Sequence, residues 1–230
     1  MKLFKFKFRT EEELEAVRHN GTLIQFIHNP SEEVQLEAVK VTGFAIQYIH
    51  NPSEEIQFEA VKQNGYAIQY IKNPSKEIQL EAVKEAGWAI QYIHNPSREI
   101  QLAAVKRDGC AIRYLHNPSE EIQFEAVKQN GLAIQHINSP SEKVQLEAVK
   151  KNGFAISYIH NPAEKVQLAS VKQNGLAIRC IYNPSEAVIR YLLDNYSSNE
   201  ELVQLLFAKI GEEGYNKLSD EDKLKLELSD

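Results

Sequence analysis

The sequence predicts an all-α protein, an α-solenoid of 22-residue helix-pair repeats with a cap at each end. Three observations carry this prediction: proline recurs at a fixed interval, glycine keeps the same interval, and apolar residues between them follow helical periodicity. The prolines are Pro30, Pro52, Pro74, Pro96, Pro118, Pro140, Pro162 and Pro184. The glycines are Gly21, Gly43, Gly65, Gly87, Gly109, Gly131, Gly153 and Gly175. Such a period is typical of stacked units that bury their apolar faces against one another.

The first helix of each unit begins near the proline. In the first complete unit, Asn29 suits the N-cap, Pro30 the first helical position and Glu32 the third position of a capping box. We expect this helix to cover 31–40. Gly43 follows it, and we expect this glycine to take the left-handed conformation that often ends a helix.

The second helix of the same unit is expected at 44–50, where the next Asn-Pro pair stops it. Neither helix reaches the roughly 12 to 15 residues that an isolated helix needs, so stacking must stabilise both. One glutamine recurs in the middle of the apolar arc of each first helix, and we expect these amides to be buried and hydrogen-bonded between neighbouring repeats. They are Gln35, Gln57, Gln79, Gln101, Gln123, Gln145 and Gln167.

The repeat core is specific enough to support a resemblance. It recurs from Ala60 to Tyr70 and further downstream, and in the first unit it reads Ala38-Val39-Lys40-x-x-Gly43-x-Ala45-Ile46-x-Tyr48. In this core the chain resembles the short tandem α-helical repeats of a bacterial and viral domain-of-unknown-function family, and more loosely HEAT-like α-solenoids. The resemblance covers about residues 11–182. It implies a helical solenoid with a scaffold role, and it brings no catalytic residues.

The ends depart from the repeat, which divides the chain into three parts. We expect an N-terminal cap with a partial repeat at 1–28, seven tandem repeats at 29–182 and a C-terminal helical cap at 183–230. Near the N-terminus, Glu12 replaces the apolar residue found at Val34, as a solvent-facing end requires. After Pro184 the repeat pattern gives way to longer amphipathic helices.

Composition narrows the classes of function. The formal net charge of −6 argues against a polycation that coats nucleic acid. No run approaches the roughly 18 to 20 continuous apolar residues of a membrane span, and the N-terminus lacks the apolar core of a signal peptide. We therefore expect a cytoplasmic protein that does not enter membranes.

Catalytic and metal-binding signatures are missing as well. The sequence contains no Gly-rich phosphate loop, no His-Glu-x-x-His and no Gly-x-Ser-x-Gly. Histidines recur near the end of most second helices, with Lys72, Asn138 and Tyr182 at this position in the others. Stacked layers lie about 8 to 10 Å apart, too far for the histidines to share a zinc ion. Capping of the helix end is their alternative role. We expect neither an enzyme nor a cofactor.

A binding surface is indicated by the second helices instead. From each repeat glycine to the next proline there is no aspartate or glutamate. We expect these segments to line a concave groove of glutamine, tyrosine and histidine that holds a protein or peptide partner, so that the protein acts as an inhibitor or adaptor. A nucleic-acid-binding solenoid is the alternative, with Lys72, Arg113 and Arg179 at phosphates, although cations are sparse on this strip.

The residues expected to select the partner lie mainly in the later repeats, where the outward positions stop copying one another. Arginine and tyrosine among them are the residue types that dominate binding hot spots, although packing at the edge of the apolar arc remains the alternative role of the tyrosines. The candidate partner-binding residues are Tyr92, Arg113, Tyr114, His116, His136, Asn138, Tyr158, Arg179 and Tyr182. The sequence does not indicate an oligomeric state.

Overall fold

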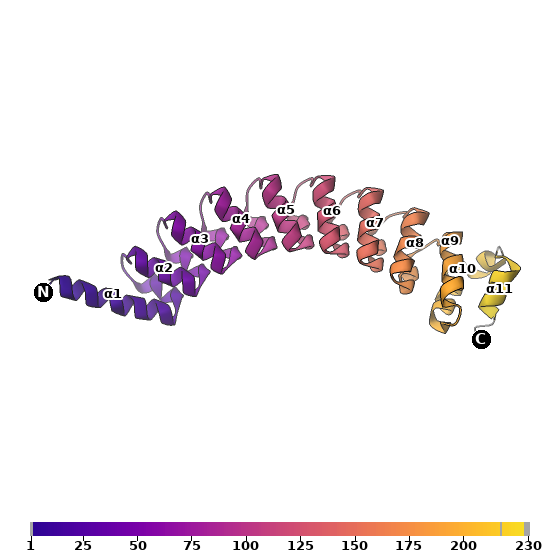
Figure 1. Ribbon diagram of the computed structural model, residues 1–230, viewed down its shortest axis with the longest axis horizontal. Helices are drawn as coiled ribbons and strands as arrows, with labels where there is room; N and C mark the ends of the chain where they lie inside the picture. Colours follow the sequence, from indigo (N-terminus) through magenta and orange to yellow (C-terminus); the bar gives the residue numbers. More distant parts are fainter. Residues whose placement is uncertain (1, 217, 228–230) are drawn as a thin grey trace. The chain divides into compact units, whose positions relative to one another are not determined.

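The computed structural model of the chain describes residues 2–216 and 218–227. Every regular element in these ranges is helical and none is a strand, which confirms the all-α solenoid (Figure 1). Within the same ranges, no helix combines the length and the apolar character that a membrane span needs.

Two kinds of helix alternate along the chain. The α-helices are α1 Lys2–His19, α2 Glu32–Val41, α3 Glu54–Gln63, α4 Lys76–Glu85, α5 Arg98–Arg107, α6 Glu120–Gln129, α7 Glu142–Lys151, α8 Glu164–Gln173, α9 Glu186–Tyr196, α10 Glu200–Asn216 and α11 Asp220–Glu227. The 3₁₀ helices are η1 Gly21–Phe26, η2 Gly43–Tyr48, η3 Gly65–Tyr70, η4 Gly87–Tyr92, η5 Gly109–Tyr114, η6 Gly131–His136, η7 Gly153–Tyr158 and η8 Gly175–Cys180.

The chain forms two compact units, Met1–His116 and Asn117–Asp230. In each unit, the α-helices of successive repeats pack side by side in one layer, and the 3₁₀ helices pack side by side in a second layer. Val34, Ala38 and Val39 of α2 and Ala45 and Ile46 of η2 are buried between the layers. The equivalent residues of the other repeats are buried too, so each repeat completes its core on its neighbours.

The second helix of each repeat is a 3₁₀ helix, whereas the sequence pattern predicts an ordinary helix at 44–50. Its bonds link residues three apart: the Ala45 amide donates to Thr42 O at 2.9 Å and the Ile49 amide to Ile46 O at 3.0 Å. A 3₁₀ helix rises about 2.0 Å per residue, compared with 1.5 Å in an α-helix. The six residues of η2 therefore extend further along the helix axis than six residues of an α-helix would.

The start of each first helix also differs from the prediction. Ser31, not Asn29, is the N-cap of α2, and its Oγ accepts from the Val34 amide at 3.3 Å. Asn29 takes the left-handed conformation with φ 51°. Asparagine tolerates this conformation better than most residues, so it reverses the chain before Pro30. The same conformation recurs at Asn51, Asn73, Asn95, Asn117, Ser139 and Asn161.

The repeat glycine is explained by close packing rather than by a left-handed cap. Gly43 does not have a positive φ; among the described glycines only Gly211 does. A Cβ atom on Gly43 would lie 2.3 Å from the Ala60 carbonyl oxygen of the next repeat. Glycine is therefore required because the backbones of neighbouring repeats lie in close contact at this position. The expectation of a left-handed Gly43 is wrong.

The glutamine ladder is half-buried and hydrogen-bonded, but its bonds lie mainly within single repeats. Gln35 Nε2 donates to Pro30 O at 2.9 Å, and the other six ladder glutamines donate in the same way to their own prolines. The side chain folds back over the first turn and pairs a carbonyl that precedes the helix. Gln167 adds a bond between repeats, because its Oε1 accepts from the Ser185 amide at 3.0 Å.

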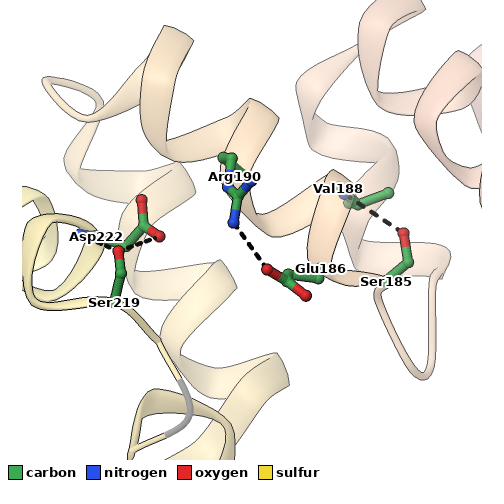
Figure 2. Close-up of polar contacts among 6 residues, drawn as sticks. All are labelled: Ser185, Glu186, Val188, Arg190, Ser219 and Asp222. Carbon is green, nitrogen blue, oxygen red and sulfur yellow. Dashed lines mark hydrogen bonds and ion pairs between the residues drawn. The ribbon is translucent and has the colours of Figure 1, made fainter.

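The C-terminal cap replaces the repeat with α9, α10 and α11. Ser185 caps the start of α9, Arg190 pairs with Glu186 on the same helix, and Ser219 caps α11 through its bonds with Asp222 (Figure 2). Ser219 Oγ lies 2.7 Å from Asp222 Oδ2, and Asp222 is buried. These polar contacts hold the ends of the capping helices where no further repeat follows.

Candidate partner-binding surface of the 3₁₀ helices

The outward side of the 3₁₀ helices, here called the 3₁₀ face, exposes tyrosine. Ala45 and Ile46 of η2 point into the core, and Gln47 and Tyr48 are left on the surface. The four tyrosines that end η2, η3, η4 and η7 have similar exposed fractions: Tyr48 42%, Tyr70 44%, Tyr92 44% and Tyr158 47%. Each of these tyrosines is thus partly buried and partly exposed to solvent.

The residue before each tyrosine is tied to its own helix. Gln47 Nε2 donates to Phe44 O at 3.0 Å, and Gln69 and Gln91 make the same bond in the next two repeats. In η7 a shorter side chain makes the equivalent bond, with Ser157 Oγ 2.8 Å from Phe154 O. The serine therefore keeps the contact but covers less of the 3₁₀ face than glutamine does.

A hollow of about 520 Å³ in the first unit, here called the hollow between η2 and η3, is lined mainly by the segments that directly follow these two helices. Its buried residues are Ile49 and Ile71, and its exposed residues include His50, Tyr70 and Lys72. The remaining lining residues are Asn51, Pro52, Gln57 and Asn73. The hollow thus combines an apolar floor with a rim of amide, phenol, imidazole and ammonium groups.

A second hollow, of about 780 Å³, occupies the same repeat positions between η6 and η7 of the other unit. Ile137, Ile159 and Tyr158 repeat the isoleucine floor and the tyrosine wall. Around them the side chains differ, and Asn138 stands where His50 stands in the first hollow. The other lining residues are Ile134, Gln135, Ser139, Pro140, Gln145, Ser157 and His160. The hollow is wider and carries no lysine.

Arg113 of η5 is stacked on aromatic rings of its own unit. Its guanidinium carbon lies 5.7 Å from the Trp88 ring centroid and 5.4 Å from that of Tyr114. The two rings pack edge to face at 5.8 Å, and Trp88 Nε1 donates to Asp108 Oδ2 at 2.7 Å. The Arg113 guanidinium is thus already in contact with two aromatic rings of its own chain.

Arg179 of η8 is paired with Glu201 of α10 in the C-terminal cap. The cap also covers Gly175, where an added Cβ would meet the Leu202 side chain at 3.1 Å. Tyr182, two residues after the end of η8, is 87% exposed. The last repeat therefore uses its arginine to hold the cap and leaves its tyrosine outside.

The predicted site residues do not form one cluster. Tyr92, Arg113, Tyr114 and His116 belong to the first unit, and His136, Asn138, Tyr158, Arg179 and Tyr182 belong to the second. Of the set, Asn138 and Tyr158 share a hollow. The candidate partner-binding set omitted Tyr70 and Lys72, which line the first hollow. Lys72 was named for the nucleic-acid alternative alone, although it stands at a position that other repeats fill with histidine, asparagine or tyrosine.

In the ranges that the structure describes, no three or more histidine, cysteine, aspartate or glutamate side chains are grouped closely enough to hold a metal ion. Cys110 is half-buried and Cys180 is exposed, and the two do not form a disulfide.

Comparison with known proteins places the repeats but assigns no activity. A protein-family model described as "Domain of unknown function (DUF4116)" matches at residues 31–74, 53–96, 75–118, 97–142 and 119–162. Successive matches begin one repeat further along and each spans about two repeats, so together they cover more than half of the chain. No curated protein and no solved structure matches the chain.

Proposed function

We propose that this protein is a non-catalytic scaffold that holds a protein or peptide partner on its 3₁₀ face. The chain belongs to the family described as a domain of unknown function (DUF4116). The partner binds at the hollows between successive 3₁₀ helices. By covering or presenting that partner, the scaffold acts as an inhibitor or an adaptor.

The observation that carries this proposal is the recurrence of one hollow at the same repeat positions in both units. Each hollow has buried isoleucines, two in the first and three in the second, and one exposed tyrosine, Tyr70 or Tyr158. Tyrosine supplies a large contact area with a polar end, and it is enriched at protein interfaces. A side chain of the partner can therefore bury apolar area on the floor and contact the tyrosine ring beside it.

The polar groups around the hollows suit an extended polypeptide. Successive backbone N–H and C=O groups of an extended chain point sideways and need partners. Outside the lining of the hollows, Gln47 and Gln69 each use one side-chain N–H to bond their own helix, which leaves the carbonyl to accept from a partner and the second N–H to donate to it. Asn51, Asn73 and Asn138 add amides that both donate and accept.

The nucleic-acid alternative is less well supported by the same surface. It requires Lys72, Arg113 and Arg179 to contact phosphates. Arg113 lies against Trp88 and Tyr114, and Arg179 is paired with Glu201, so two of these three cations are already engaged. Neutralising several phosphates supplies much of the affinity of nucleic-acid binders, and this strip has few cations left to do so.

Peptide display against the full chain tests the proposal. We expect random peptides to be enriched, and we expect Tyr70→Ala combined with Tyr158→Ala to weaken the selected peptides about tenfold, as loss of interface aromatic anchors does. The matched control is Lys84→Ala combined with Lys150→Ala, which removes exposed side chains from the α-helical layer and leaves affinity unchanged. Failure to enrich any peptide, together with salt-sensitive binding of single-stranded oligonucleotides, would contradict the scaffold and favour nucleic acid.

A further inference from the structure

The two hollows share their backbone positions but not their charge. We infer that the hollow between η2 and η3, lined by His50, Tyr70 and Lys72, is a subsite for a carboxylate, namely an aspartate or glutamate side chain of the bound peptide. This inference rests on the proposed function and specifies one residue class of the partner. The counterpart between η6 and η7 receives an uncharged side chain.

The ammonium group of Lys72 is available to a ligand. Lys72 is exposed and belongs to no ion pair in the part of the chain that the structure describes. Some other exposed lysines are paired, such as Lys62 with Glu59 and Lys165 with Glu142. The described lining of the hollow also contains no acidic residue. The three donors of the Lys72 ammonium group are therefore available to a ligand.

The second argument is the set of groups around that charge. His50, Tyr70, Asn51 and Asn73 line the same hollow, and their side chains carry imidazole, hydroxyl and amide groups. A carboxylate accepts several hydrogen bonds, and its bonds to cationic donors are stronger than those between neutral groups. The buried isoleucines beneath the rim exclude water on one side, which strengthens attraction between opposite charges.

The third argument is the contrast with the second hollow. His160 stands at the position of Lys72, and Asn138 at that of His50. Ser157 is shorter than Gln69 and still bonds its own helix. The result is a wider hollow with amide and hydroxyl groups around it, which suits a larger uncharged side chain. The chain therefore contains its own matched control for the charge of Lys72.

A phosphate is the competing anion, and the observations favour a carboxylate. The position of Lys72 is filled in the other repeats by His28, His50, His94, His116, Asn138, His160 and Tyr182. One lysine in such a series matches one acidic side chain better than a run of phosphates. The net charge of −6 also repels a polyanion more strongly than it repels a single carboxylate.

The test is an NMR titration of the isotope-labelled full chain with N-acetyl-glutamate N-methylamide, and separately with the matching glutamine compound. We expect the glutamate compound to shift backbone amides near 49–51 and 70–73, and to bind about three- to fivefold more tightly than the glutamine compound, as one exposed ion pair allows. Lys72→His should abolish this preference. His160→Lys should create the same preference for the glutamate compound, observed as shifts of the backbone amides near 137–139 and 158–161.

Equal binding of the two compounds, or an unchanged preference in Lys72→His, would overturn the inference. Tighter binding of inorganic phosphate at the same amides would overturn it in favour of a phosphate site. Circular dichroism checks that both variants, each altered at an exposed residue, remain folded. Because this titration uses single-residue compounds, a positive result stands even if peptide display fails. Conversely, uncharged preferences in displayed peptides would sustain the scaffold without this subsite.

Discussion

The hollow between η2 and η3 and the hollow between η6 and η7 are built at the same repeat positions, yet their volumes are about 520 and 780 Å³ and their rims differ in charge. The backbone contacts beneath them are alike. Gly43 and Gly131 each approach an alanine carbonyl of the next repeat, and Gln57 and Gln145 each bond their own proline. The contacts between stacked repeats therefore keep the backbone alike at the two hollows, whereas the outward side chains determine the chemistry of each hollow.

This separation has a physical cause. The stacking residues touch backbone atoms at close range, so a change there forces neighbouring repeats apart. Some residues on the 3₁₀ face bond their own helix instead, as Ser157 and Gln69 do. Outward positions can therefore vary between repeats at little cost in stability.

The largest effect is expected from Gly43→Ala and Gly131→Ala. The added Cβ would lie 2.3 Å from Ala60 O in the first variant and 2.5 Å from Ala148 O in the second. We expect each variant to lose about 3 kcal/mol of unfolding free energy, since backbone cannot move aside without separating the repeats. Urea unfolding measures the loss, with exposed Gln47→Ala as control. A parent-like midpoint for Gly43→Ala would show that the close contact does not hold the stack.

A smaller effect is expected from narrowing the second hollow to resemble the first. Asn138→His combined with Ser157→Gln restores side chains found in the earlier repeats and removes part of the open volume. Peptides selected on the parent chain should bind about tenfold more weakly, which corresponds to about 1.4 kcal/mol. Fluorescence anisotropy with labelled peptides measures the change. If the reverse change, Gln69→Ser, weakens the same peptides equally, the second hollow is not where they bind.

Removal of the proline-bound amides should affect both hollows alike. Gln57→Ala and Gln145→Ala each delete a 2.9 Å bond to a proline carbonyl, and we expect each to cost about 1 kcal/mol of unfolding free energy. Gln101→Ala, which loses the same bond, should match them. Thermal unfolding compares the three variants. Unequal losses would mean that bonds between repeats, rather than bonds within them, determine the stability of the ladder.

The smallest effect is expected at the C-terminal cap, beyond the second hollow. Arg179→Ala removes the ion pair with Glu201, whose side chains are 49% and 63% exposed. Exposed pairs contribute about 0.2 to 1 kcal/mol, so the loss in unfolding free energy should lie in that range and vanish at high salt. A double-mutant cycle with Glu201→Gln isolates the pair. A salt-independent loss would instead assign Arg179 a packing role.

Much of the fold follows from local patterns in the amino-acid sequence. Proline and glycine spacing locates every repeat, and the apolar periodicity identifies Val34, Ala38 and Val39 as core residues. These signals are local, because they depend on residues within one or two helical turns. Of the candidate site, the sequence identifies the 3₁₀ segments as acid-free but does not bring Asn138 together with Tyr158. That juxtaposition spans a whole repeat.

The amino-acid sequence by itself determined that this protein is a helical repeat chain, where each repeat begins and which positions are buried. Only the tertiary structure decided that the second helices are 3₁₀ helices and that Gly43 is needed for a close approach of two backbones. It also decided that Arg113 contacts Trp88 and that Arg179 pairs with Glu201. The physical reason is range. Helix signals lie within a few residues, whereas these features depend on atoms about one repeat apart that meet only when repeats stack.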